Sequence, residues 1–231
     1  HTMDNISDIE RLIRVKINTS YQIDTSHREV VLILLNGSFK VGETTFSRSD
    51  VFTGEADGFC ISNSGMVSID PDRECEICII KSACVSNKII PLTRFDKKSF
   101  QTNLVGSGNY YRSVKSIIDS RSNLSNLLVG ETTQDCGNWS SWPPHKHDTY
   151  IEDCESNHKE IYLYKFENKS GFGIQMVYKD LDNPDLILVR DNDTVNIDSG
   201  YHPVVSSPLS KMYYLWVLFG DNEFFKVNYE S

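Results

Sequence analysis

The chain of 231 residues is long enough for two compact domains of ordinary size, and its composition excludes several classes of protein. With 39% apolar and 24% charged residues, it has the composition of an ordinary globular protein rather than of a disordered or fibrous one. A formal net charge of −9, without a clustered basic segment, argues against a nucleic-acid partner, because proteins that bind nucleic acids neutralise phosphates with basic faces.

Helical periodicity occurs only near the start of the chain, whereas strand patterns recur along the rest. Apolar residues over Ile6–Ile13 can share one face of a helix. Apolar and aromatic runs predict strands at Val30–Leu35, Phe59–Ile61, Met66–Ile69, Glu76–Ile80, Tyr110–Ile118, Asn126–Val129, Ile161–Phe166, Phe172–Tyr178, Leu186–Val189 and Tyr213–Leu218. Turn signals such as Asn36-Gly37 and Ser199-Gly200 separate these runs, so the predicted fold class is all-β.

Membrane and secretion signals are missing from the sequence. The longest apolar run, Val30–Leu35, has the length of a strand and is far shorter than the roughly 20 residues that cross a bilayer. The N-terminus has no basic segment followed by an apolar one. We therefore expect a cytoplasmic protein with no membrane partner.

Two of the six cysteines, Cys75 and Cys78, have the CxxC spacing that occurs in zinc and redox sites. They lie in a run with the apolar content of a strand, where residues three apart point to opposite faces. No second CxxC follows. The pattern disfavours a metal site here, and we expect reduced thiols.

The segment Pro91–Asn109 has few apolar residues and contains the triplet Gly106-Ser-Gly108. This composition is typical of a linker between two β-rich halves. We therefore predict an N-terminal domain over residues 1–100 and a C-terminal domain over residues 101–231.

The pair His145 and His147 is the most informative motif of the second half. On an extended backbone, residues i and i+2 project to the same face, so both imidazoles can reach one cation. Pro143-Pro144 directly before the pair favours a sheet edge with a stiff approach. A His-x-His pair alone more often consists of exposed residues that bind no metal, so the interpretation depends on further ligands.

Two further ligands are predicted from their positions in the chain. His202 follows the Ser199-Gly200 turn and precedes an apolar segment, whereas His158 lies in a polar stretch and is expected to be solvated. Glu160 heads an alternating strand, whereas Glu155 lies in a loop, where carboxylates are usually solvated. Three imidazoles and one carboxylate suit a divalent Zn, Mn, Fe or Ni ion better than Ca or Mg.

The order His-x-His, Glu and a later His resembles the metal site of the cupin superfamily, which implies two tandem cupin domains of the jelly-roll type. Twelve residues separate His147 from Glu160, which is more than is usual in cupins. Several motifs resemble the 5-deoxy-glucuronate isomerase family of inositol catabolism more closely: Gly130-Glu-Thr, Gly137-Asn-Trp-Ser-Ser-Trp-Pro-Pro-His-Lys-His-Asp148, Glu160-Ile-Tyr, Gly171-Phe-Gly-Ile-Gln175, Gly200-Tyr-His-Pro-Val204 and Tyr213-Tyr-Leu-Trp216.

The resemblance implies an aldose–ketose isomerase that converts 5-deoxy-glucuronate to 5-dehydro-2-deoxy-gluconate at a divalent metal ion. The first half matches the family less well, and we expect its domain to be metal-free and the chain to be a candidate homodimer. The base is left unassigned among residues near the motifs, with Glu160, Tyr164 and Gln175 as the candidate catalytic residues. Arg112 and Arg190 are candidates for binding the substrate carboxylate. A cupin oxygenase and a non-catalytic sugar-binding cupin stay open as alternatives.

Overall fold

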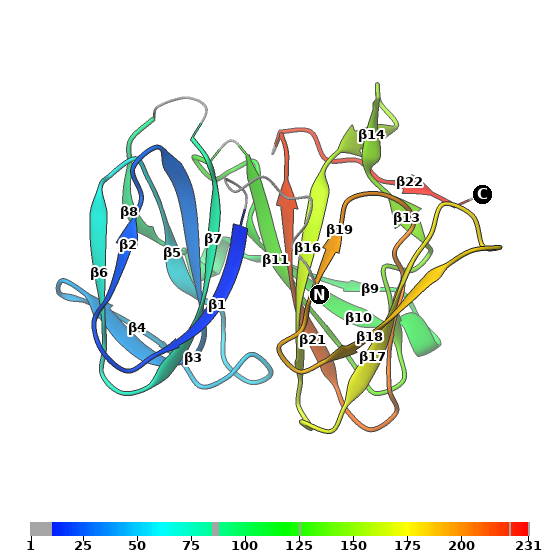
Figure 1. Ribbon diagram of the computed structural model, residues 1–231, viewed down its shortest axis with the longest axis horizontal. Coiled ribbons are helices and arrows are strands. Elements are labelled where there is room, and N and C mark those ends of the chain that lie inside the picture. The colour runs from blue at the N-terminus through cyan, green and yellow to red at the C-terminus, as the bar shows by residue number, and fades with distance from the viewer. Residues whose placement is uncertain (1–10, 85–87, 125, 222, 231) are drawn as a thin grey trace. The chain divides into compact units, whose positions relative to one another are not determined.

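The computed structural model describes residues 11–84, 88–124, 126–221 and 223–230, and nearly all regular structure in them is β-strand (Figure 1). No α-helix occurs in this part of the chain, which confirms the predicted all-β class. Most of the helix predicted over Ile6–Ile13 lies outside the described residues. Its last three residues lie in a strand, Arg11–Ile17, because Leu12 is buried and the backbone pairs along seven positions with Cys75–Lys81. None of the described residues forms a helix suited to crossing a membrane.

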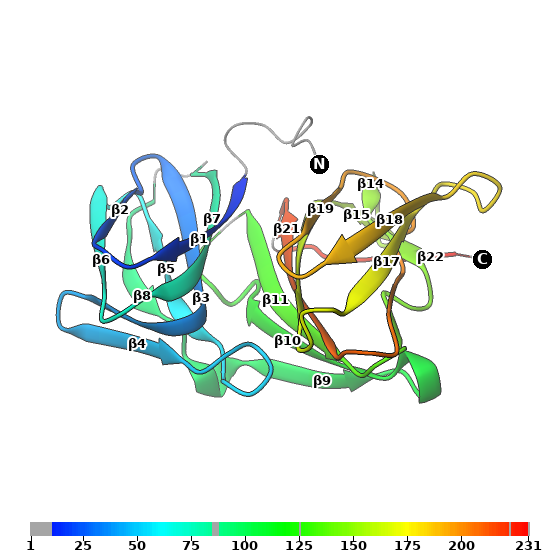
Figure 2. The ribbon, with the colours of Figure 1, turned by 60° about the horizontal axis from the view of Figure 1, so that its bottom comes forward.

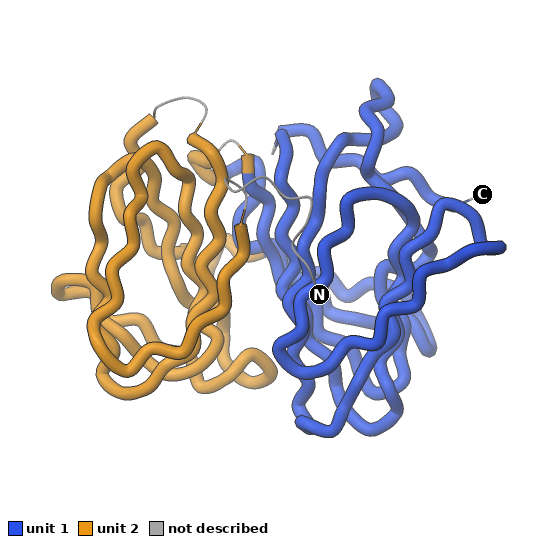
Figure 3. Tube along the Cα trace, in the orientation of Figure 1, with its two compact units in different colours: residues 1–3, 101–121, 127–231 blue, residues 4–100, 122–126 orange. Residues whose placement is uncertain are grey.

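The described residues belong to two compact units, one of residues 4–100 with 122–126 and the other of residues 101–121 with 127–231 (Figure 3). The return of residues 122–126 to the first unit is not part of the predicted division at residue 100. The strands of the first unit are β1 (Arg11–Ile17), β2 (Tyr21–Asp24), β3 (Arg28–Val41), β4 (Thr44–Arg48), β5 (Asp57–Ser62), β6 (Met66–Pro71), β7 (Cys75–Ala83) and β8 (Ile90–Arg94).

The long strand β3 organises the first unit. Its first half pairs with β5 and β7, and its second half pairs with β4 and β6. A register shift between Leu34 and Asn36 and the positive φ of +100° at Gly37 mark the bend between the halves. A Cβ at Gly37 would lie 2.6 Å from the Cβ of Cys75, so only glycine fits this bend.

Apolar side chains fill the interior of the first unit. The rings of Phe39 and Phe46 stack with their centroids 4.8 Å apart, and the ring of Phe59 lies 5.6 Å from that of Phe46. All three are essentially inaccessible to solvent. Burial raises the pKa of the Cys75 thiol to about 11, so this member of the CxxC pair is a buried thiol of the core rather than a thiolate.

The second unit contains the remaining strands and two sheets that face each other. Its strands are β9 (Gln101–Val105), β10 (Arg112–Ile118), β11 (Leu127–Gln134), β12 (Trp139–Ser140), β13 (His145–Lys146), β14 (Asp148–Ile151), β15 (Glu155–Asn157), β16 (Lys159–Phe166), β17 (Phe172–Val177), β18 (Asp185–Arg190), β19 (Thr194–Ile197), β20 (Val204–Ser206), β21 (Met212–Phe219) and β22 (Asn228–Tyr229). One sheet has the order β19-β16-β21-β11-β10-β9 and the other β12-β20-β17-β18, while β13 pairs with β22 and β14 with β15. Figure 2 shows β11, β10 and β9 side by side in the six-stranded sheet.

The core of the second unit joins the two sheets. Tyr162, Tyr164 and Phe166 alternate along β16 and pack against Val189 of β18 and Val204 of β20. The face shared by the even-numbered residues of β16 is therefore the inner face of the sandwich. Glu160 belongs to the same alternation at the head of the strand.

The predicted linker over Pro91–Asn109 is structured for most of its length. It contains most of β8, short 3-10 turns at Lys97–Ser99 and Gly108–Tyr110, and the whole of β9. Strand β9 pairs with β10 over five residues at the edge of the six-stranded sheet. Its side chains are mostly exposed, which explains why its composition resembles that of a linker.

Candidate metal centre

His147 is held between two short strands by its contacts with His158. The backbone N–H of His158 donates to the carbonyl of His147 at 2.8 Å, and the Nδ1–H of His147 donates to the carbonyl of His158 at 3.1 Å. The ring is 3% exposed. Because a carbonyl oxygen can only accept, Nδ1 must carry a proton, and Nε2 is the nitrogen left for other chemistry.

Glu160 lies on an internal strand of a sheet rather than in a loop. It pairs with Ile197 of β19 on one side and with Leu218 of β21 on the other. The neighbouring strands fix its backbone, and its side chain projects from the inner face of the sandwich, where it is 5% exposed. The carboxylate therefore has little freedom to reach water.

His202 is positioned by a turn that requires glycine. Gly200 has φ +95°, and a Cβ there would lie 2.6 Å from the carbonyl oxygen of Tyr178. Tyr178 and Tyr201 exchange two backbone hydrogen bonds directly before His202. The Nδ1–H of His202 donates to the carbonyl of Gly200 at 2.9 Å, so its Nε2 also carries a free lone pair.

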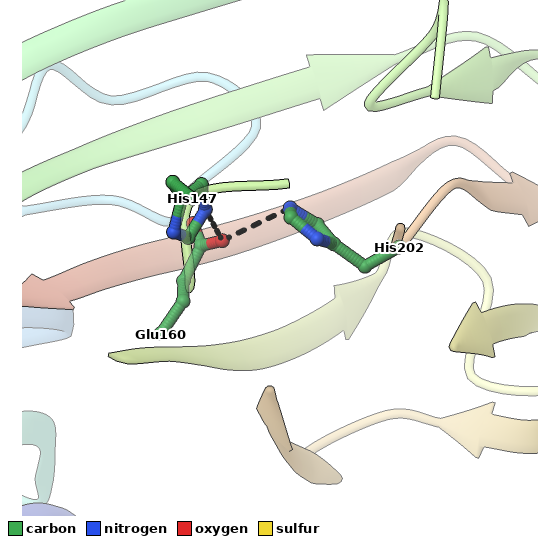
Figure 4. Close-up of side chains that lie close together, drawn as sticks. All are labelled: His147, Glu160 and His202. Atoms are coloured by element: carbon green, nitrogen blue, oxygen red, sulfur yellow. Dashed lines mark hydrogen bonds and ion pairs between the residues drawn. The ribbon is translucent and has the colours of Figure 1, made fainter. Parts of the chain in front are cut away.

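Three of the four predicted ligands converge, with their ligand atoms all within 4.8 Å of one another: His147, Glu160 and His202. The Nε2 atoms of His147 and His202 lie 3.1 and 3.3 Å from the same oxygen, Oε2 of Glu160 (Figure 4). All three side chains are buried. They come from the segment between β13 and β14, from β16 and from the turn before β20, which are distant in sequence.

The donor set fits a divalent cation. Two imidazole lone pairs and a carboxylate oxygen are all acceptors, and acceptors that face one another need a positive charge between them. One proton on His147 can satisfy its contact with Glu160, but Nε2 of His202 has no hydrogen-bond partner among the described residues. Backbone carbonyls that fix the second ring nitrogen are also the usual support of metal-binding histidines.

The pKa values of Glu160 and His147 also indicate that positive charge is favoured between these side chains. Burial raises the pKa of Glu160, but the hydrogen bond from His147 and the close approach of the His147 and His202 rings outweigh it and hold the pKa at about 2. Burial lowers the pKa of His147, and the hydrogen bond and charge of Glu160 outweigh it, so the pKa lies above its ordinary value. The Glu160 carboxylate is therefore ionised, and a cation beside it is electrostatically favourable.

His145, the fourth predicted ligand, lies beside this group and is not one of the three converging residues. Its ring centroid is 4.9 Å from that of His202 and 6.3 Å from that of His147. Its Nδ1 lies 3.2 Å from the carbonyl of Pro143, which leaves Nε2 as its available nitrogen. Burial, with the neighbouring His202 and His147, lowers the pKa of His145 to about 3, so the ring is neutral. Its assignment as a ligand stays a prediction.

A cavity of about 160 Å³ is lined by His147 and Glu160 of this group and by His145, whereas His202 is not among its described lining residues. It is smaller than the pockets of several hundred Å³ that hold drug-sized molecules, so it suits a small ligand. Its wall combines the histidines and the carboxylate with hydroxyl groups and one guanidinium. The described lining residues are Arg112, Val114, Thr132, Ser141, His145, His147, Glu160, Tyr162, Tyr214, Trp216, Leu218 and Phe225.

Tyr164 and Gln175, two of the predicted catalytic residues, are not among those lining residues. The hydroxyl of Tyr164 donates to Oε1 of Gln175 at 2.5 Å, and both side chains are fully buried. The Gln175 amide donates to the carbonyls of Met176 and His202 at 2.8 Å. This pair therefore supports the backbone of the His202 turn. Tyr162, two residues before Tyr164, is the tyrosine of β16 that lines the cavity.

Two expectations about the polar stretch after His147 are wrong. His158 is buried, because its Nε2–H donates to the carbonyl of Asp221 at 2.8 Å and its ring packs 5.5 Å from that of Phe225. Glu155 is also buried, with Lys146 Nζ at 2.8 Å from its Oε1. The partner of Glu155 lies on β13, nine residues earlier, and the partner of His158 lies more than 60 residues away, which local composition does not reveal.

Sequence reasoning missed the cavity residues that come from other strands. Ser141, Tyr162 and Tyr214 lie within motifs of the family resemblance but are not among the predicted site residues, and Phe225 lies in no motif. Tyr162 lies on β16 and Tyr214 on the neighbouring strand β21. Their ring centroids lie 4.6 Å apart. Strand parity relative to Glu160 places Tyr162 on the inner face of β16, together with Tyr164. No comparable signal marks Phe225.

The model of the KduI/IolB family matches residues 5–230, which is nearly the whole chain. The chain belongs to the KduI/IolB family. A relative, the 5-deoxy-glucuronate isomerase of Shouchella clausii, is 31% identical over 230 residues, which cover 96% of this chain and 84% of the relative. The 5-deoxy-glucuronate isomerase of Bacillus subtilis strain 168 is 30% identical over 91% of this chain and 80% of its own. These relatives confirm the prediction of an enzyme that resembles 5-deoxy-glucuronate isomerase.

Solved structures extend the likeness of this KduI/IolB chain to the whole fold. An IolB-like protein from Salmonella typhimurium has a TM-score of 0.84 at 26% identity, covering 95% of this chain and 86% of that one. The oxalate decarboxylase of Bacillus subtilis, studied for its Mn(II) centres, has a TM-score of 0.60 at 11% identity, covering 95% and 71%. The second likeness concerns the fold alone, and the predicted cupin fold is confirmed.

Proposed function

We propose that this chain is a metal-dependent aldose–ketose isomerase that converts 5-deoxy-glucuronate to 5-dehydro-2-deoxy-gluconate in inositol catabolism. The proposal takes its reaction from the relatives named 5-deoxy-glucuronate isomerase. The observation that carries it is the convergence of three acceptor atoms, from His147, Glu160 and His202, beside a small cavity that His147 and Glu160 line. A cation held by these atoms would supply a positive centre for the oxygens of a sugar bound there.

The proposed ligands are His147, Glu160 and His202, with His145 as the fourth, for a divalent Zn, Mn, Fe or Ni ion. Such an ion supplies Lewis acidity, which withdraws electron density from the carbonyl and adjacent hydroxyl oxygens of a sugar. Mixed nitrogen and oxygen donors favour these transition metals over Ca or Mg. The backbone carbonyls that accept from each Nδ1–H keep the rings oriented toward the cavity.

Hydroxyl groups of the chain would contact the reacting end of the sugar. Ser141 and Tyr162 line the cavity beside Glu160, with their hydroxyl oxygens 3.1 Å apart. Either hydroxyl can donate to a substrate oxygen on which negative charge develops, and donors fixed before the reaction cost no rearrangement. Moving a proton between neighbouring carbons also requires a base. Glu160, the one predicted catalytic residue on the cavity wall, serves in this proposal as a metal ligand, and the base stays unassigned.

The proposal is tested by incubating the metal-loaded protein with 5-deoxy-glucuronate and following ketose formation by NMR, in air and under nitrogen. We expect the same conversion in both atmospheres and none after removal of the metal with a chelator. Turnover that requires O₂ would support a cupin oxygenase instead. Binding of the sugar acid without any conversion would support a non-catalytic sugar-binding cupin.

A further inference from the structure

Arg112 is a buried cation at the wall of the same cavity. It begins β10, is 8% exposed and is the one arginine or lysine among the described lining residues. Its Nη1 donates to the carbonyl of Tyr110 and its Nη2 to the carbonyl of Trp142, both at 3.0 Å. Both acceptors are neutral, and in the described part of the chain no carboxylate pairs with the guanidinium.

A buried guanidinium without a counter-ion is costly, because it has lost water without gaining a negative charge. Two backbone carbonyls satisfy only part of its five N–H donors. The same carbonyls hold the group in place, and that of Trp142 lies in the segment that leads to His145. Arg112 is therefore a preformed anion site on a wall that it shares with the metal centre.

The rest of the wall indicates the kind of anion. Four hydroxyl-bearing residues, Thr132, Ser141, Tyr162 and Tyr214, line the cavity together with Arg112, beside the apolar side chains of Val114, Trp216, Leu218 and Phe225. Hydroxyls both donate and accept, as the hydroxyls of a sugar do. A planar carboxylate matches the fork of a guanidinium, so a small acid that carries hydroxyl groups and a carbon backbone can contact both kinds of side chain.

We propose that Arg112 binds the carboxylate of the sugar acid and thereby makes the cavity selective for acids over neutral sugars. The carbonyl end of the ligand then faces His147, Glu160 and His202. The identity of the reacting group rests on the proposed function, whereas the preference for a carboxylate does not. Arg190, the other candidate from the sequence, is an exposed residue of β18 and is not among the lining residues.

The test compares the binding of D-glucuronate and D-glucose to the metal-loaded protein by isothermal titration calorimetry. We expect the wild type to prefer glucuronate, and Arg112→Met to weaken glucuronate binding by about 10- to 100-fold, the usual effect of losing hydrogen bonds to a charged group, without weakening glucose binding. Arg190→Met is the matched control and keeps the preference. Arg112→Gln retains amide donors for the two carbonyls, so it decides the matter if Arg112→Met does not fold.

Three outcomes would overturn the proposal. The wild type could show no preference for glucuronate, or the preference could survive in both Arg112 variants. The variants could also bind glucuronate and glucose more weakly by the same factor, which would indicate a purely structural role. Failure of the proposed function is distinguishable from these. A protein that does not convert 5-deoxy-glucuronate but loses its preference for glucuronate in Arg112→Gln retains the carboxylate site and lacks the reaction.

Discussion

The interior of the unit of residues 4–100 is filled by the rings of Phe39, Phe46 and Phe59, whereas the interior of the unit of residues 101–231 opens into a cavity lined by His147 and Glu160. Both units are antiparallel β-structures with a long apolar strand at their centre. The difference lies in the side chains on the inner face. One unit fills that face with aromatic packing, and the other places two buried histidines and a carboxylate on part of it, at the expense of apolar contacts.

The largest expected effect comes from removing two of the buried histidines of the second unit. His147→Ala together with His202→Ala leaves Glu160 as a buried carboxylate without imidazole partners, so metal binding and isomerisation should both be lost. Metal content by mass spectrometry and NMR turnover measure the two effects. His27→Asn in the first unit is the control, because its φ of 57° suits asparagine, and it should retain both properties. Full metal content in the double variant would contradict the assignment.

Phe59→Ala tests the aromatic core of the first unit. The ring is 1% exposed and contacts two other aromatic rings, so its removal should cost about 3–5 kcal/mol of unfolding free energy. Chemical denaturation measures the loss, and Met66→Ala, at a side chain that is 62% exposed, should change it by less than about 0.5 kcal/mol. At temperatures where the variant is folded, metal content should equal that of the wild type. Metal loss in folded Phe59→Ala protein would show that the two interiors are not independent in function.

Asp148→Asn changes a side chain that supports the candidate metal centre but is not itself a proposed ligand. Asp148 Oδ2 accepts from the backbone N–H of Gly200 at 2.7 Å, and Oδ1 accepts from Lys146 at 2.8 Å, so the residue joins the His147 strand to the His202 turn. We expect metal affinity to fall by about 10- to 100-fold, the usual effect of losing an outer partner of a metal site. Competition with a chelating dye measures it. Asp185→Asn, at an exposed end of β18, is the control, and equal affinities in all three proteins would refute the supporting role.

The smallest effect concerns acid stability in the first unit. Burial raises the pKa of Asp57, but hydrogen bonds from Arg94 and the backbone of Ser47 outweigh it, so the pKa lies below its ordinary value of 3.8. A lowered pKa in the folded state stabilises the protein above pH 3.8, and this contribution is lost as the pH falls through the folded-state value. Urea unfolding of wild type and Asp57→Asn should therefore differ at pH 6 and converge in acid. A difference that grows in acid would contradict the sign.

The sequence predicts the strands and the positions of the converging residues, because both depend on local spacing. Glu160 could be chosen over Glu155 from its place at the head of an alternating strand. The burial of Glu155 and His158 could not be predicted, because it depends on the ion pair of Glu155 with Lys146 and on the contacts of His158 with Asp221 and Phe225. Strand parity alone also could not decide between Tyr162 and Tyr164, which project from the same face of β16 at different depths in the sandwich.

Crystallography of the zinc-loaded protein, with anomalous scattering recorded at the zinc edge, tests the central claim most directly. We predict one strong peak within about 2.0–2.2 Å of Nε2 of His147, Nε2 of His202 and a carboxylate oxygen of Glu160. A peak elsewhere, or zinc-loaded crystals in which Nε2 of His202 faces no metal, would contradict the account.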